Sequence, residues 1–274
     1  MKAHASYPTL LEMFYRFEKG KANQVFLSEP IAGKPLAHTW EEAGFSIRKM
    51  AGALFALHLP AGSRIAIIGK NSAHWIMADL AVTMAGHVSV PIYPTVTAST
   101  LRQILTHSES QVLFVGKLDA FEPLQSGIPS NVRCIHFPHW AWSGCEHWDT
   151  FIENADAIMG DTIPDPQALS CILYTSGTTG DPKGVMHTHF AHSFSLLTVM
   201  EALGEDLQNE VFFSYLPLSH IAERMVVEYC GIFTGGTIYF PESLATFSRD
   251  LAAAQPTIFL AVPRIWEKFR EEIL

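Results

Sequence analysis

The stretch at positions 174–184, with the sequence YTSGTTGDPKG, constrains the fold more than any other part of the chain. The apolar residues 168–173 in front of it predict a short buried strand, and residues 185–203 behind it predict a helix. The stretch is therefore expected to be a loop between a strand and a helix. Its glycines allow backbone conformations that expose successive N–H groups, while its hydroxyl groups and Lys183 add donors and a positive charge. This composition predicts a binding loop for an anion with several oxygens, such as a phosphate.

The spacing within this stretch excludes two common nucleotide-binding loops. It contains no Gly-Lys-Ser/Thr and no Gly-x-Gly-x-x-Gly, so it is neither a P-loop nor a dinucleotide-binding loop. A polar turn with a neighbouring lysine is the alternative, but packing alone gives no reason for so many hydroxyl groups between a strand and a helix. A third kind of phosphate loop is indicated.

The undecapeptide closely resembles the phosphate-binding signature of the adenylate-forming enzymes, which include acyl-CoA synthetases, luciferases and the adenylation domains of peptide synthetases. The resemblance implies two half-reactions. A carboxylate attacks the α-phosphate of ATP to give an acyl-adenylate and pyrophosphate, and a thiol, usually that of coenzyme A, then displaces AMP. Such a transfer is catalysed mainly by holding the reactants in line and by neutralising charge with Mg²⁺, hydroxyl groups, N–H groups and lysine.

The same resemblance implies roles for individual residues. The β- and γ-phosphates would be held by Thr175, Ser176, Gly177, Thr178, Thr179, Gly180 and Lys183. The hydroxyl group of Thr175 is the expected Mg²⁺ ligand. His220, in the segment LPLSHIAER at 216–224, would lie beside the carboxylate under attack. The alternative for His220 is an ordinary histidine at the start of a helix.

Three segments resemble the long-chain branch of the acyl-CoA synthetases, namely residues 69–95, 216–224 and 262–268. Residues 69–95 are interpreted as helix and strand packing, and none of them is a catalytic candidate. After the phosphate loop, relatives often have Asn two positions beyond Thr-His, whereas this chain has Ala191 there. His187, His189 and His192 are expected to be ordinary helix positions, because their spacing does not place all three on one face.

Composition and charge narrow the class of protein further. The chain has 274 residues, of which 48% are hydrophobic and 16% charged, so it can bury a substantial core. A formal net charge of −9 and the lack of any Lys/Arg run argue against a nucleic-acid partner. With no signal-peptide pattern and no uninterrupted apolar stretch of about 18 residues, a cytoplasmic protein is expected. A fatty acid substrate would be compatible with peripheral membrane contact, but no basic amphipathic helix supports it.

The cysteines and the histidines near them suggest packing rather than metal binding. The four cysteines lie far apart without a C-x-x-C pair, which favours reduced thiols over a disulfide framework. The best candidate metal site comprises Cys134, His136, His139, Cys145 and His147. Its spacing does not match a zinc site, and tryptophans are interleaved with it, so an aromatic-rich surface loop is the preferred interpretation.

The order of apolar segments predicts an α/β fold with layered, mostly parallel sheets and helices on both faces. The expected strands are at 24–28, 36–40, 64–69, 88–93, 111–116, 168–173, 210–215, 237–240 and 257–261, and the expected helices are at 10–17, 39–58, 72–85, 99–107, 185–203, 221–235, 244–254 and from 262 onward. Residues 1–165 are expected to form the first α/β sheet layer of a large N-terminal domain. Residues 166–274 would hold the phosphate loop and the start of a second layer. The strand order does not follow from the sequence.

By comparison with the superfamily, the chain corresponds to the front half of a longer enzyme. Segments that contact adenine and ribose, and a C-terminal domain with its catalytic lysine, are expected beyond it, so the piece alone is expected to be inactive. The leading hypothesis is an ATP-dependent long-chain fatty acid:CoA ligase. Alternatives are a fatty acyl-AMP ligase that loads a carrier protein, a non-catalytic nucleotide- or acyl-binding remnant and, more remotely, a structural metal-binding module. Acyl chain length and oligomeric state do not follow from the sequence.

Overall fold

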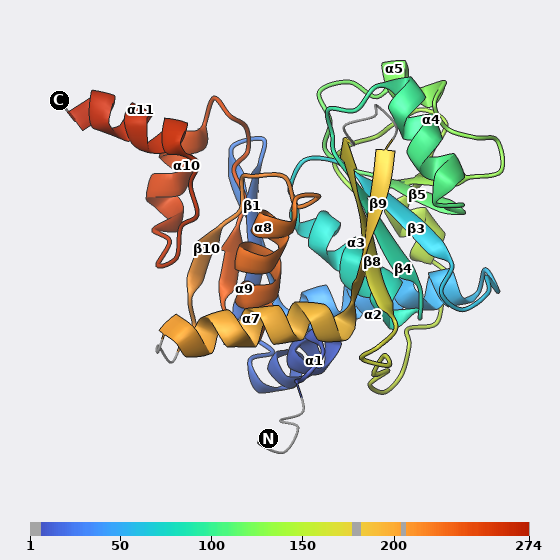
Figure 1. The fold of residues 1–274 in the computed structure, drawn as a ribbon, viewed down its shortest axis with the longest axis horizontal. Coiled ribbons are helices and arrows are strands. Elements are labelled where there is room, and N and C mark those ends of the chain that lie inside the picture. The colour runs from blue at the N-terminus through green and yellow to red at the C-terminus, as the bar shows by residue number, and fades with distance from the viewer. Residues whose placement is uncertain (1–6, 177–181, 204–206, 274) are drawn as a thin grey trace.

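The computed structural model describes residues 7–176, 182–203 and 207–273. In this part of the chain two sheets lie side by side (Figure 1). The larger sheet has the order β7-β6-β5-β3-β4-β8-β9, and the smaller has the order β10-β11-β1-β2. Neighbouring strands are parallel except in the pairs β1–β2 and β8–β9. The predicted α/β fold with mostly parallel sheets is confirmed.

The strands of the larger sheet are β3 (Arg64–Ile68), β4 (Val88–Ile92), β5 (Val112–Val115), β6 (Arg133–His136), β7 (Glu146–His147), β8 (Leu169–Ser176) and β9 (Pro182–Thr188). Those of the smaller sheet are β1 (Val25–Ile31), β2 (Lys34–Thr39), β10 (Val211–Phe213) and β11 (Thr237–Tyr239). The helices are α1 (Leu10–Gly20), α2 (Trp40–Phe55), α3 (Ala73–Met84), α4 (Ala98–His107), α5 (Glu122–Gln125), α6 (Trp148–Ile152), α7 (His189–Leu203), α8 (Ile221–Glu223), the π-helical segment η1 (Arg224–Tyr229), α9 (Cys230–Thr234), α10 (Phe247–Ala254) and α11 (Pro263–Ile273).

Helix α3 joins the two sheets. All of its residues are buried, and it contacts β3 and β4 of the larger sheet as well as β1 of the smaller one. Figure 1 shows α3 between the sheets and α7 passing beneath the smaller sheet from the end of β9. One apolar core continues through this layer, with Ile67 on β3, Phe26 on β1 and Ile238 on β11 among its members. The sheets are therefore parts of one packed unit.

Helix starts in the first part of the chain are capped by side chains, and Thr39 followed three positions later by Glu42 has the sequence pattern that predicts a capping box. At the start of α2, the Glu42 N–H donates to Thr39 Oγ1 at 3.2 Å, and the Thr39 N–H donates to Glu42 Oε2 at 2.9 Å. This capping box is confirmed, and it satisfies two backbone donors that the first helical turn leaves free. Ser72 caps α3 in a simpler way, by accepting from the Trp75 N–H at 3.3 Å. No helix in the described part of the chain has the length and hydropathy needed to span a bilayer.

The prediction of a helix from residue 185 is wrong for its first four residues. Residues 182–188 form β9, which pairs antiparallel with β8 and places Gly184 opposite Tyr174. A Cβ atom on Gly184 would lie 2.7 Å from Cγ2 of Ile172, so glycine permits the close approach of the two strands. The helix begins at His189. The phosphate-loop stretch therefore joins two strands rather than a strand and a helix.

Two other predicted elements differ from the structure. Residues 257–261 form no regular strand; only an isolated bridge pairs Ile258 with Phe212. The predicted helix at 221–235 is interrupted by the π-helical segment η1, in which the Cys230 N–H donates to the carbonyl of Met225, five residues earlier. It ends at Gly235, whose φ of +62° suits a residue without a Cβ atom.

The expectation of reduced thiols is wrong for Cys134 and Cys145, which form a disulfide. Strand β6 and the turn before β7 bring their Cα atoms within 4.6 Å. The loop between them is fixed by Trp142, whose Nε1 donates to the Gly116 carbonyl at 2.8 Å. The spacing of the two cysteines in the sequence does not predict this short distance, because the tertiary fold of the loop brings them together. The cysteines at 171 and 230 are free and buried, as expected for packing residues.

The predicted division at residue 165 does not coincide with the sheets. Strands β1 and β2 come before this position but pair in the sheet that contains β10 and β11. Strands β8 and β9 come after it and extend the larger sheet. Each sheet therefore draws strands from both sides of residue 165, and the division into 1–165 and 166–274 stays a prediction about segments of the chain.

Candidate functional site

The β8–β9 hairpin presents the two described ends of the phosphate-loop stretch. Thr175 and Lys183 are directly opposite each other in the register, and both are exposed. Ser176 is the last residue of β8. The candidates Gly177, Thr178, Thr179 and Gly180 lie outside the described residues. A hydroxyl group and an ammonium group thus stand as a cross-strand pair at the base of the predicted loop.

The base of the hairpin is anchored to the larger sheet and its flanking helix. Tyr174 is 5% exposed, and its hydroxyl group is 2.6 Å from Nδ1 of His107 at the end of α4. Burial raises the pKa of the Tyr174 hydroxyl. The phenol of Tyr174 therefore stays neutral and hydrogen-bonded to His107. This contact holds the backbone next to Thr175 in place.

His220 lies at the start of α8, after the carboxyl end of β10. Its backbone is extended, as is usual for an N-cap residue, and the Ala222 N–H donates to its Nδ1 at 3.2 Å. Because Nδ1 accepts, the proton of the neutral imidazole is assigned to Nε2. The side chain is exposed, whereas the neighbouring Ser219 is buried. His220 can therefore offer an N–H donor to a ligand outside the helix.

Asn71 fixes the segment that leads to His220, although the sequence did not single it out as a site residue. Its Nδ2 donates to Ser214 Oγ at 2.8 Å and to the Leu216 carbonyl at 2.6 Å. Its Oδ1 accepts from the Leu218 N–H at 3.0 Å. Asn71 follows β3 of the larger sheet, so one side chain ties that sheet to the strand end of the smaller one. A polar residue three positions after the end of a buried strand is the signal that could have identified it.

A second buried support is Glu223, which is 1% exposed. Its Oε1 accepts from Ser214 Oγ at 3.0 Å. Burial raises the pKa of the Glu223 carboxyl to about 8, against the opposing effect of the Ser214 hydrogen bond. The side chain is therefore largely neutral at pH 7. Asn71, Ser214 and Glu223 form a continuous hydrogen-bonded chain beneath the turn that carries His220.

A cavity of about 360 Å³ lies where the carboxyl ends of strands from both sheets meet. Lys70 and Lys117 line it from the larger sheet, and Ser214 and Pro241 line it from the smaller one. Lys117 Nζ donates to the Pro241 carbonyl at 2.9 Å, and burial lowers the pKa of this ammonium group. In parallel α/β sheets, ligands bind at the carboxyl ends of the strands. This side of the molecule is therefore the candidate binding side.

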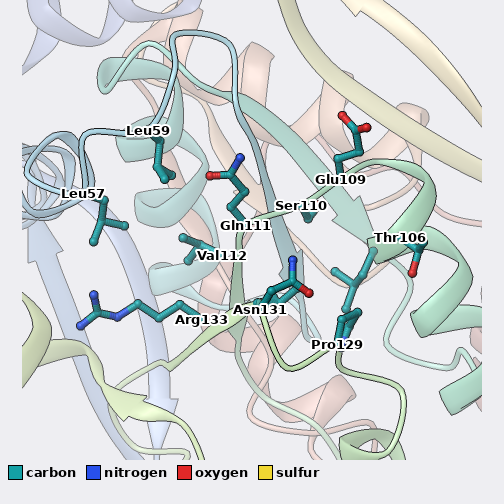
Figure 2. A pocket seen from close by; sticks show the side chains of 12 residues that line it. Leu57, Leu59, Thr106, Glu109, Ser110, Gln111, Val112, Pro129, Asn131 and Arg133 are labelled. Carbon is teal, nitrogen blue, oxygen red and sulfur yellow. The ribbon is translucent and has the colours of Figure 1, made fainter.

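Another cavity, of about 600 Å³, lies at the opposite ends of the strands. Figure 2 shows the side chains that line it. Gln111 and Arg133, which line it, stand at the starts of β5 and β6. Neither the hairpin nor His220 contributes to it. Its position at the amino ends makes it a weaker candidate than the cavity between the sheets.

The structure places Thr175, Lys183 and His220 on the same side of the fold but does not bring all three into contact. Thr175 lies at the carboxyl end of β8, Lys183 lies opposite it on β9, and His220 follows the carboxyl end of β10. In the described ranges, no hydrogen bond joins the hairpin to His220. No group of three or more His, Cys, Asp or Glu residues within those ranges is arranged to hold a metal ion.

The fold is the α/β fold of the adenylate-forming enzymes. Solved structures share the fold: a benzoate CoA ligase from Burkholderia xenovorans has a TM-score of 0.79 at 19% identity, covering 93% of this chain and 50% of its own. The O-succinylbenzoate coenzyme A synthetase of Bacillus subtilis, solved in complex with AMP, has a TM-score of 0.76 at 22% identity, covering 97% of this chain and 51% of its own.

The chain belongs to the AMP-binding enzyme family, whose sequence pattern it matches over residues 16–273. It is 32% identical over 259 residues to the long-chain-fatty-acid--CoA ligase ACSBG2 of Homo sapiens, covering 85% of this chain and 38% of the relative. It is 29% identical over 257 residues to long chain acyl-CoA synthetase 3 of Arabidopsis thaliana, covering 86% of this chain and 38% of the relative. The chain thus spans about two fifths of the length of these curated relatives.

Proposed function

We propose that this chain provides the phosphate-binding and carboxylate-binding elements of an ATP-dependent long-chain fatty acid:CoA ligase. The observation that carries the proposal is the exposed pair of Thr175 and Lys183 at the base of the loop SGTTGD. The similarity to long-chain ligases supports the choice of a fatty acid as the carboxylate substrate.

In the first half-reaction, a carboxylate oxygen of the fatty acid attacks the α-phosphate of ATP, and the bond to the β-phosphate breaks to release pyrophosphate. Lys183 and the loop residues 175–180 hold the β- and γ-phosphates and neutralise the leaving group. The outward Nε2–H of His220 donates to the carboxylate and orients it for attack. In the second half-reaction, the thiol of coenzyme A displaces AMP.

The donor set at the end of β8 is suited to Mg²⁺ shared with phosphates. Thr175 is exposed there and offers a hydroxyl oxygen, while Mg²⁺ in such sites takes most of its ligands from phosphate oxygens and water. The ion would supply charge neutralisation at the phosphates when bound. Thr175 would hold it, and Lys183 on the opposite strand would supply the remaining positive charge.

Calorimetric titration of this chain with ATP and Mg²⁺ tests the phosphate-binding role. We expect Lys183→Ala to weaken binding about tenfold, since a charge-assisted contact to phosphate contributes roughly 1.5 kcal/mol. Lys34→Ala, which removes an exposed lysine from β2, is the matched control and should leave the affinity unchanged. Equal affinities for the two variants would show that Lys183 does not bind phosphate.

Product analysis with palmitate, on a protein that joins this chain to the remaining length of its relatives, distinguishes the ligase from its alternatives, because the piece alone is expected to be inactive. Pyrophosphate release followed by formation of palmitoyl-CoA supports the proposed function. Transfer of the acyl group only to a phosphopantetheine carrier protein would favour a fatty acyl-AMP ligase. Binding of ATP without pyrophosphate release would favour a non-catalytic nucleotide-binding role.

A further inference from the structure

A buried charged cluster lies in the helix layer between the two sheets. It consists of Asp79 on α3 and of Arg224 and Glu228 on η1, all of which are at most 1% exposed. Arg224 Nη2 donates to Asp79 Oδ2 at 2.5 Å. Arg224 Nε is 3.7 Å from Glu228 Oε2. The cluster thus connects the central helix of the fold to the helical segment that begins beside His220.

The three groups form a unit with no net charge. The Asp79 carboxylate balances the Arg224 guanidinium. Burial opposes the charged form of Arg224, but the negative charge of Asp79 keeps its pKa well above the ordinary value. Burial, together with the negative charge of Asp79, raises the pKa of Glu228 well above its usual range, so Glu228 is neutral. The guanidinium also lies over the ring of Trp75, 5.7 Å from its centroid.

Stability alone does not explain such a cluster. Removing charged groups from water costs several kcal/mol per ion, and apolar side chains of similar volume often fill the same space at no loss of stability. Several of its polar atoms also lack a hydrogen bond among the described residues, including Nη1 of Arg224. Buried ion pairs can instead specify one arrangement of elements over its alternatives. In this protein, the arrangement that the cluster can specify is the packing of η1 against α3.

Arg224 is directly connected to the turn that carries His220. Its N–H donates to the His220 carbonyl at 3.1 Å, so the two residues close one helical turn. The adjacent Glu223 anchors the same turn on the other side, through Ser214. From Arg224 onward the helix is π-helical, a rare conformation that commonly marks functional sites. The rotation of this segment about its axis determines where the imidazole points.

We propose that Arg224, held by Asp79 and Glu228, is a positioning residue for His220. The ion pair fixes the rotation of the segment 221–234, and the segment presents His220 with Nδ1 closed by the Ala222 N–H and Nε2 directed outward. What His220 then contacts rests on the proposed function. The orientation itself does not, because every group in the cluster belongs to the chain.

The test replaces the whole cluster by apolar residues, with Asp79→Leu, Arg224→Met and Glu228→Leu in one protein. The readouts are the ¹⁵N chemical shifts of the His220 imidazole, which report its tautomer, and hydrogen exchange at the Ala222 amide. We expect the tautomer preference to be lost and exchange at Ala222 to become at least tenfold faster. Global unfolding in urea should remain cooperative.

The matched control removes another ion pair, with Glu18→Leu and Arg48→Met. These side chains are 13% and 15% exposed and pair at 2.6 Å between α1 and α2. This change should leave both His220 readouts as in the parent protein. If the cluster variant keeps the parent tautomer and Ala222 exchange rate, the positioning role is wrong.

A conservative variant covers the case in which the triple variant does not fold. Asp79→Asn keeps the volume of the side chain but removes the charge that holds Arg224. We expect it to speed Ala222 exchange at least fivefold relative to the amides of α3. If the exchange rates of Ala222 and of the α3 amides change by the same factor, the role of the cluster is purely structural. Because neither readout involves ATP or palmitate, failure to bind these ligands would reject the proposed function and leave this inference standing.

Discussion

Glu223 is a carboxyl group that the fold keeps protonated at neutral pH. It is fully enclosed beside Ser214, and its pKa is about 8 in the folded protein against an ordinary value of 4.5. In the unfolded chain the same group is ionised above its ordinary pKa. The folded state therefore binds an extra proton between pH 4.5 and pH 8, and stability from this residue falls as pH rises through that window.

Glu223→Gln makes this dependence measurable, because glutamine stays neutral at every pH. We expect the variant to gain stability over the parent protein between pH 5 and pH 8, by roughly 2–4 kcal/mol at about 1.4 kcal/mol per pKa unit. Urea unfolding at pH 5, 6.5 and 8 measures the gain. The exposed Glu41→Gln change is the control for loss of one carboxylate. A stability difference that does not vary with pH would contradict a protonated Glu223.

At the scale of single residues, the sequence was enough to predict site residues whose chemistry is local. It was not enough to find residues whose role depends on partners far away in the chain. The glycines, hydroxyl groups and lysine of 174–184 form one continuous pattern, so their type and spacing suffice to propose a phosphate loop. Asn71 bonds to groups 143 to 147 positions away, and Arg224 pairs with Asp79 at a separation of 145. Only the fold brings these groups together.

At the scale of elements, the β8–β9 hairpin depends on one glycine. A side chain at position 184 would meet Ile172 Cγ2 at 2.7 Å and the Tyr174 ring at 3.3 Å. We expect Gly184→Ala to push β9 away from β8, to destabilise the protein by about 1–3 kcal/mol and to displace Lys183. Urea unfolding measures the loss, and the affinity for ATP with Mg²⁺ reports the displacement.

Gly20→Ala is the control for that substitution. Gly20 is the last residue of α1, and a Cβ atom there would meet nothing within 4 Å. Because alanine favours a helix over glycine, this change should be neutral or stabilising by up to about 1 kcal/mol. If both glycine changes have the same effect, close strand packing at Gly184 is not the cause.

Helices and strands whose boundaries are encoded by adjacent residues were predicted well. Those whose conformation depends on pairing with distant parts of the chain were not. The capping box at Thr39 and Glu42 fixes the start of α2 from four adjacent residues. The apolar residues Val185 and Met186 suggested a helix, yet they lie exposed on an edge strand, 45% and 67%. Their conformation is determined by pairing with β8, which a helical apolar spacing does not reveal.

At the scale of the whole molecule, the sequence was enough to predict mostly parallel α/β sheets. It was not enough to predict the order of the strands within them. Alternating strand and helix signals indicate parallel α/β layers, whereas the pairing of β1 with β11 joins segments about 210 positions apart. The shared helix layer explains why the division at residue 165 does not separate two cores. Burial is also the largest cause of the pKa shifts of several histidines and carboxyl groups.

These groups predict an asymmetric dependence of stability on pH. Burial lowers the pKa of His74 to about 3, of His189 to about 4 and of His192 to about 2. The unfolded chain takes up these protons below pH 6.5, so stability falls as the pH is lowered. The Glu29 carboxyl, with a pKa raised by burial to about 7, acts in the opposite direction above pH 4.5, as Glu223 does.

We therefore expect maximum stability near pH 6.5. Between pH 4.5 and 6.5 the buried histidines and the buried carboxyl groups, Glu228 included, act in opposite directions. Below pH 4.5 stability should fall steeply, because the histidines and hydrogen-bonded carboxylates such as Asp161 take up protons on unfolding. Above pH 6.5 stability should decline toward pH 8 as the buried carboxyl groups ionise. Urea unfolding from pH 3.5 to 8.5 measures the profile. His74→Phe keeps the ring contact with Trp148 and should reduce the acid slope by about 1.4 kcal/mol per pH unit, the value for one proton. An unchanged slope in that variant would show that His74 is not neutral in the folded protein.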